Sequence, residues 1–159
     1  MESLNPFRKV DNSEYTSEMP TYPGFILTSH VFIKGIQAGS CLSLVLGPIY
    51  AYARHRETFF RSFNRTLVIS PIIGGIATSL LLLGKAYSDE TLTYAGVDDR
   101  AFRLVNNEGQ NRVDLYSAMG ATAGIITAVV GRAPLGVVPL GIAAGVVASV
   151  AQKFVGKKD

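Results

Sequence analysis

The residues that most often carry catalysis are few in this sequence and lie apart from one another. Ser29 precedes His30, but adjacency along the chain does not orient a hydroxyl toward an imidazole, and no third group is indicated. His30 and His55 have no cysteine or paired carboxylate at metal-ligand spacing. Cys41 is the only cysteine, which excludes an intrachain disulfide, and it is expected to be a buried, inert thiol. We therefore expect no catalytic residue, no metal site and no cofactor.

A different chemistry, the recognition of phosphate, is indicated by residues 54–65, which read RHRETFFRSFNR. Guanidinium groups bind phosphate oxygens bidentately, and phenyl rings between them favour the boundary of headgroups and acyl chains. Basic residues lie in short connections instead of along one amphipathic face, which favours anionic lipid over nucleic acid as the partner. The alternative is a solvated loop. The candidate lipid-binding residues are Arg54, Arg56, Arg61 and Arg65.

Four long runs without any Asp, Glu, Lys or Arg must position these groups, at residues 35–53, 66–84, 115–131 and 133–152. A helix crosses the hydrocarbon core of a bilayer with roughly 20 mostly apolar residues. With 48% hydrophobic and 17% charged residues, the composition excludes an ordinary water-soluble enzyme. We predict an all-α membrane protein whose four transmembrane helices lie at about residues 33–53, 66–84, 113–131 and 134–154.

The segments outside these spans divide the chain further. Residues 1–24 are polar and rich in proline, and are predicted to form an irregular arm. Residues 25–154 are predicted to form the transmembrane domain, and residues 155–159 a basic tail. The arm carries acidic beside basic residues, so we expect neither a secretory signal peptide nor a cleaved presequence. Residues 85–114 form a long connection of mixed charge, which can fold over the bundle or dock on a partner.

Two charged residues and one proline border the spans. Lys34 precedes the first run and is expected to extend its ammonium to the headgroups. Asp114 precedes the third run and is expected to cap a helix start; the alternative is a buried ion pair with Arg112 or with another chain. Residues 131–134 are so short a connection that the last two spans are predicted to form an antiparallel hairpin. Pro134 is expected in the opening turn of the last helix.

Small residues recur every four positions within the spans, which places them on one face of each helix. Such faces let helix backbones approach closely in lipid, where burial of apolar surface gives little gain. They pack either within this chain or against the helices of another protein. Pro48 and Pro71 lie within predicted spans and mark either kinks or helix ends. The candidate helix-packing residues are Gly35, Gly39, Gly47, Gly74, Gly120, Gly124, Gly141 and Gly145.

A transport function would need ionisable groups inside the membrane, and the four runs contain no Asp, Glu, Lys, Arg or His. Their serine and threonine hydroxyls are expected to bond to carbonyls of their own helix instead of lining a channel. A small solute channel with a wet lumen remains an alternative.

The stretch at residues 114–154, DLYSAMGATAGIITAVVGRAPLGVVPLGIAAGVVASVAQKF, resembles the four-helix superfamily of the mitochondrial inner-membrane protein translocases, the Tim channel family. The shared pattern is a polar residue that opens the span, the glycines of MGATAG, a short turn and the small-residue run GIAAGVVAS. Within that superfamily it looks most similar to the respiratory member, the membrane-arm accessory subunit of NADH:ubiquinone oxidoreductase (complex I). Ala118 and Met119 depart from the pattern, in which paired glycines are expected.

The resemblance implies a Tim-translocase-like bundle in the mitochondrial inner membrane that is not an enzyme. It implies a structural subunit of the respiratory chain that braces the core membrane-arm subunits of complex I by helix packing and by bound phospholipid, with cardiolipin expected. The alternative is a subunit of an inner-membrane protein translocase.

Overall fold

The computed structural model describes residues 20–54, 56–88 and 93–155. All the regular elements within these ranges are helical. They are, in chain order, α1 (Pro23–Arg54), the short 3-10 helix η2 (Arg56–Thr58), α2 (Phe59–Ser88), α3 (Tyr94–Val105), α4 (Glu108–Val130) and α5 (Val137–Val155). Residues 1–19 of the predicted arm (1–24) and residues 156–159 of the predicted tail lie outside the described residues, as does the side chain of Arg56.

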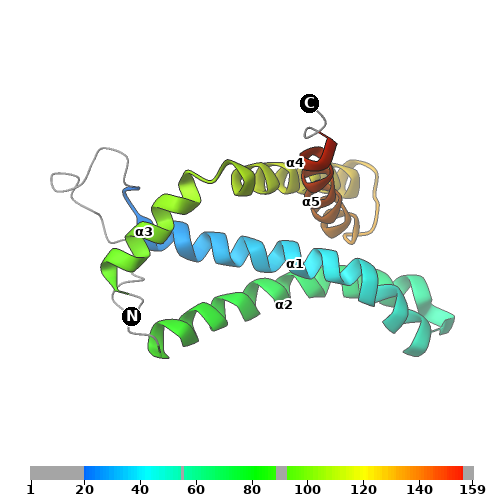
Figure 1. Cartoon of the computed structure of the whole chain (residues 1–159). Helices are drawn as coiled ribbons and strands as arrows, with labels where there is room; N and C mark the ends of the chain where they lie inside the picture. The colour runs from blue at the N-terminus through cyan, green and yellow to red at the C-terminus, as the bar shows by residue number, and fades with distance from the viewer. Residues whose placement is uncertain (1–19, 55, 89–92, 156–159) are drawn as a thin grey trace.

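Two helical hairpins make up the bundle. α1 and α2 lie side by side along most of their length, joined by η2 (Figure 1). α4 and α5 form the second hairpin, which packs against the first mainly through α5 on α1. α3 lies across the beginning of α1, between the two hairpins in the chain (Figure 1). The predicted antiparallel pairing of the last two spans is confirmed.

Four of these helices, α1, α2, α4 and α5, are long and apolar enough to cross a membrane. The predicted class, an all-α membrane protein with four transmembrane helices, is therefore confirmed. α1 begins ten residues before the predicted start at about 33, and α2 starts at Phe59 and ends at Ser88 instead of at 66 and 84. The charge-free runs underestimate these helices because the helical backbone continues into the polar flanks. Pro48 and Pro71 both lie inside helices, so neither marks an end.

The last helix begins later than predicted. α5 starts at Val137, so Pro134 precedes it by three residues and is not in its opening turn. Arg132 has φ of 52°, a left-handed conformation that ends the helical path after α4. Ala133 is disfavoured in helical conformation because a proline follows it. Val137 N then donates to the Pro134 carbonyl at 3.1 Å, which closes a turn before the helix begins.

Large apolar side chains lie mostly on the outside of the bundle. Leu81 and Val129, for example, each expose 73% of their surface, whereas the fully buried side chains are small ones such as Ser40 and Ser43. In water this distribution would be unfavourable. It is the expected one where the surroundings are hydrocarbon, since lipid tails are as apolar as leucine.

α3 folds the predicted mixed-charge connection over the bundle. Its N-cap Thr93 accepts a hydrogen bond from Gly96 N. Val97 and Ala101, four residues apart, are fully buried, and the Val97 cluster includes Leu27 of α1 and Leu82 of α2. Its outer face carries an exposed ion pair between Arg103 and Asp99 at 3.1 Å. The helix is therefore amphipathic and held by a small apolar contact.

We expect the substitution Val97→Asp to release α3 from the bundle, because an unpaired carboxylate in this apolar contact costs several kcal/mol. Hydrogen exchange of the α3 amides should then accelerate to the rate of an unprotected helix. Val105→Asp is the matched control, since Val105 belongs to the same helix and is 46% exposed. Equal exchange in the two variants would contradict the docking of α3 through Val97.

Candidate functional site

The candidate glycines of α1 and α2 lie against each other. A Cβ added at Gly35 would meet the Gly74 carbonyl, with its carbon at 2.7 Å, and one added at Gly39 would come within 2.8 Å of Pro71 Cα. Gly47 differs, because its added Cβ would meet the Phe63 ring at 3.0 Å. The first two positions therefore bring backbone against backbone, and the third seats an aromatic ring.

The second hairpin has the same construction. A Cβ at Gly120 would lie 2.6 Å from the Gly141 carbonyl carbon, and one at Gly124 would lie 2.7 Å from Val138 Cα. At Gly145 the added atom would come within 2.8 Å of Ser117 Cα. The glycine faces of α4 and α5 thus pack within this chain, in an antiparallel register that leaves no room for a side chain.

Most hydroxyls in the spans bond to a carbonyl of their own helix, as predicted. Ser40 donates to Ile36 O at 2.8 Å, and Thr127 donates to Ala123 O at 2.8 Å. Thr78 also reaches the neighbouring helix, donating to Val31 O at 3.1 Å. These hydroxyls are therefore occupied inside the bundle.

A polar network that the local pattern did not predict joins the two hairpins. Lys34 Nζ lies 2.6 Å from Asp114 Oδ1 and donates to Gln37 Oε1 at 3.1 Å. Gln37 Nε2 donates to Asp114 Oδ1 at 2.8 Å and to Ser117 Oγ at 2.7 Å. Ser117 in turn donates to the Asp114 backbone carbonyl at 3.0 Å. Every hydrogen-bonding atom of the buried Gln37 side chain has a partner.

This network corrects two expectations. Lys34 does not extend to the headgroups but turns toward α4, eleven residues inside α1. Asp114 does not cap its helix, because Asn107 is the N-cap of α4 and Asp114 lies within the helix. The ion pair foreseen with Arg112 or another chain forms with Lys34 instead. His30 adds a weaker contact, with Nδ1 at 3.6 Å from Asp114 Oδ2.

The network lies at a different position along the apolar run of each helix. The charge-free runs of α1 and α4 begin next to Lys34 and Asp114, at residues 35 and 115. Gly35 packs on Gly74, however, so the pair lies opposite the middle of the run at residues 66–84 of α2. α2 therefore stays apolar over a stretch where α4 is already charged.

Ser29 and His30 follow each other in α1. Ser29 Oγ donates to Phe25 O at 2.6 Å, so its hydroxyl is held by its own helix. Among the described residues, no three of His, Cys, Asp and Glu gather as metal ligands. Cys41 is half-buried in α1.

Two of the candidate arginines share a groove of about 710 Å³ at the end of the first hairpin. Arg61 and Arg65, one helical turn apart on α2, line it together with the hydroxyl-bearing Thr58, Ser62 and Thr66 and with Tyr50 of α1. The groove continues along α2 to Ile69 and Ile73. It therefore runs from cationic and hydroxyl groups onto an apolar floor, an arrangement that suits a phosphate and an acyl chain.

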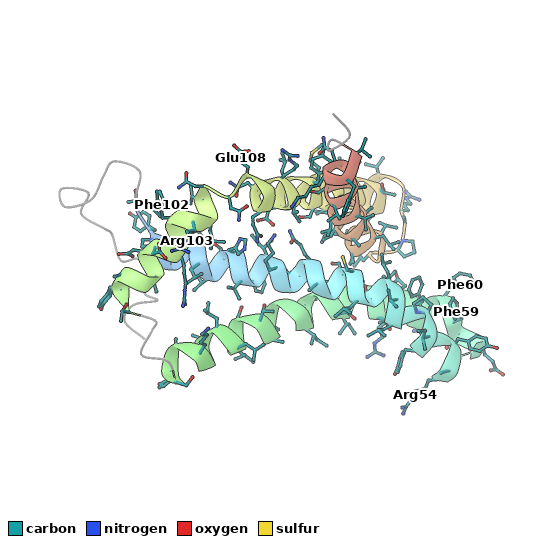
Figure 2. All side chains as sticks on the ribbon, in the orientation of Figure 1. Arg54, Phe59, Phe60, Phe102, Arg103 and Glu108 are labelled. Atoms are coloured by element: carbon teal, nitrogen blue, oxygen red, sulfur yellow. The ribbon has the colours of Figure 1, made fainter. Side chains whose placement is uncertain are left out.

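Arg54 does not line this groove, and the side chain of Arg56 lies outside the described residues. Arg54 extends away from the bundle at the end of α1 (Figure 2). Phe59 and Phe60 lie at the same end (Figure 2), with ring centroids 5.4 Å apart in an edge-to-face arrangement. The opposite end of the second hairpin holds a further basic groove, between the start of α4 and the end of α5, which no pattern in the sequence predicts.

The fold and these sites define a helical membrane protein whose backbones pack closely through glycine. The chain belongs to the family described as "Protein of unknown function (DUF1757)", which matches residues 7–152. No curated protein and no solved structure is significantly similar to the chain.

We expect Gly120→Ala to destabilise the second hairpin by about 1–3 kcal/mol, because its methyl group would meet the Gly141 backbone, which cannot yield as a side chain can. The free energy of unfolding in mixed micelles, titrated with SDS, measures this. Gly84→Ala is the matched control, since nothing lies within 4 Å of its added Cβ, and it should leave stability unchanged or raise it. A similar loss at both positions would argue against the backbone contact.

The polar network predicts a double-mutant cycle. Lys34→Met leaves Asp114 charged without its cation, and should cost about 2 kcal/mol, less than the roughly 3–5 kcal/mol of a fully buried pair, because about a quarter of each side chain is exposed. The double variant Lys34→Met/Asp114→Leu should be more stable than Lys34→Met alone. The same SDS titration measures both, together with Asp114→Leu alone, which completes the cycle. Additive losses would show that the two side chains do not interact.

Proposed function

We propose that this protein is a non-catalytic accessory subunit of mitochondrial respiratory complex I, in the inner membrane, where it stabilises the membrane arm by helix packing and lipid contact. The assignment to complex I rests on the resemblance of residues 114–154 to the Tim-like superfamily and its respiratory member. The alternative is a subunit of an inner-membrane protein translocase. The structural role rests on the outer surface of the two hairpins.

The observation that carries the structural role is a pair of open grooves floored by glycine. One, of about 360 Å³, runs along α1 and α2 over Gly39 and Gly74, with Ala38 and Ala77 at its sides. The other, of about 440 Å³, runs along α4 and α5 over Gly120 and is bordered by alanines. Small side chains at such a surface let a further helix approach closely.

The first groove lies beside, and not on, the face of α1 that contacts the second hairpin. Ala38 and Leu42 line the groove, whereas Lys34 and Gln37 of the same helix contact α4. At about 100° per residue, the centres of these two sets lie about 90° apart around α1, and the residues that line the groove all belong to α1 and α2. The groove is therefore available to a transmembrane helix of a neighbouring subunit, with Leu42 and Ile73 exposed at its margin.

Lipid contact has its own support. Within the part of the chain that the structure describes, neither Arg61 nor Arg65 forms an ion pair. Both are exposed in a groove that also holds hydroxyl groups. Two arginines in this position suit the phosphates of an anionic phospholipid such as cardiolipin.

The test of this function fills the grooves without disturbing the bundle. We expect Ala77→Phe and Ala123→Phe to weaken the association with neighbouring helices by about 2 kcal/mol, roughly thirty-fold, because overpacking a close contact costs that much. Tagged variants in mitochondria that lack the native chain are extracted in digitonin and resolved on native gels. Less variant should migrate with complex I, and NADH:ubiquinone activity should fall.

Ile76→Phe is the matched control, since Ile76 is exposed and lies outside the residues that line the α1/α2 groove. Precursor import is assayed in the same mitochondria. Loss of import with complex I assembled normally would favour the translocase alternative. Normal assembly and normal import in both Ala77→Phe and Ala123→Phe would exclude the grooves as contacts with other subunits.

A further inference from the structure

The groove between the start of α4 and the end of α5 has the features of a second phosphate site. It has a volume of about 810 Å³. Arg112 and Lys153 line it from the two helices, and Val150 and Phe154 add exposed apolar surface. The groove thus combines two cations with apolar walls, as the groove lined by Arg61 and Arg65 does. The residues of the two grooves come from different parts of the sequence.

A buried hydroxyl in this groove has no partner among the described residues. Ser149 lines the groove and is only 4% exposed. No hydrogen bond from its side chain forms within the described ranges, although other serines of the spans, such as Ser40, bond to their own helix. A buried polar group without a partner destabilises the folded chain. An acceptor seated in the groove would remove that destabilisation.

The charges around Ser149 favour an anion. Among the described residues, neither Arg112 nor Lys153 is paired with an acid. Glu108 also lines the groove and reduces, but does not cancel, the positive charge. Asn107 is engaged, because its side chain accepts from Gln110 N as the N-cap of α4.

The groove lies one membrane thickness from the arginine groove. Residues 113–130 of α4 rise about 27 Å, close to the roughly 30 Å of a hydrocarbon core. At the far end of this hairpin, Gly136 N donates to Asn64 Oδ1 at 2.9 Å, beside Arg65. Glu108, at the start of α4, lies well apart from Phe60 at the end of the first hairpin (Figure 2).

We propose that the α4/α5 groove seats the phosphate of an anionic phospholipid, in the leaflet opposite to the one that Arg61 and Arg65 contact. Arg112 and Lys153 bind the phosphate oxygens, and the Ser149 hydroxyl donates to one of them. The acyl chain continues over Val150 and Phe154. This inference rests on the membrane setting of the four helices and not on the identity of the assembly, so it is tested on the purified chain.

The experiment measures lipid retention. The full chain is purified into nanodiscs of phosphatidylcholine alone or of phosphatidylcholine with phosphatidylglycerol, delipidated mildly, and analysed by native mass spectrometry. Arg112→Gln/Lys153→Gln should lower the preference for phosphatidylglycerol about thirty-fold, since each basic residue near the surface contributes about five-fold. Ser149→Ala should lower retention of both lipids about tenfold, because both carry the phosphodiester.

Control variants separate the site from other causes. All variants are repeated in an Arg61→Gln/Arg65→Gln background, so that the remaining lipid reports the α4/α5 groove alone. Arg112→Lys/Lys153→Arg keeps the charges and should retain the lipid, and Glu108→Gln should raise retention about five-fold. SDS titration of Ser149→Ala should show a folded chain of unchanged or higher stability.

Two results would overturn the proposal. One is retention of phosphatidylglycerol that is unchanged in Arg112→Gln/Lys153→Gln within the arginine-depleted background. The other is displacement of the lipid by inorganic phosphate alone, which would make the groove a site for a soluble anion.

Discussion

Contact between helix backbones is the interaction on which the rest of this structure depends. Inside a bilayer, bringing two apolar helices together gains little from the hydrophobic effect, so association relies on close van der Waals packing. Gly35 against Gly74 and Gly120 against Gly141 supply that contact, once in each hairpin. Because small residues occupy the contacts between the paired helices, the large apolar side chains face outward. The inverted distribution of side-chain size follows from this single constraint.

The two hairpins then need a reason to adopt one relative position, and the polar network supplies it. Packing between smooth apolar surfaces permits sliding, whereas the Lys34 ammonium has its shortest contact at Asp114. Gln37 and Ser117 fix the same register with hydrogen bonds that a shift by one turn would break. At the other end, Asn64 holds the turn before α5 through Gly136 N. A pair of polar contacts thus locates the second hairpin at both ends.

Sequence patterns predicted the elements well and their partners poorly. Charge-free runs identify four spans, because the cost of burying charge in lipid acts on each helix separately. Spacing of glycines identifies the packing faces for the same local reason. The sequence predicts Lys34 and Asp114 at the membrane surface, because nothing in the neighbourhood of either residue reveals a partner 80 residues away.

Other features escaped prediction because they depend on tertiary geometry. The packing of α3 on Leu27 depends on where the first hairpin ends, which the sequence does not show. Ser149 has the same sequence context as the serines that bond to their own helix, and only the structure distinguishes it. Residue type alone does not distinguish Arg61 and Arg65, which line one groove, from Arg54. The rotation of α2 about its axis sets the direction of their side chains.

The unequal apolar lengths of α2 and α4 have a consequence for the surrounding lipid. Beside α2 the hydrocarbon can extend along residues 75–84, but at the corresponding depth α4 already presents Asp114 and Arg112. Water and headgroups must therefore dip toward α4, which thins one leaflet locally on that flank only. Each ångström of such mismatch costs a fraction of a kcal/mol. A neighbouring protein with short hydrophobic segments would relieve that cost by settling on the thinned side, so the shape of the bilayer itself would help to select what gathers there.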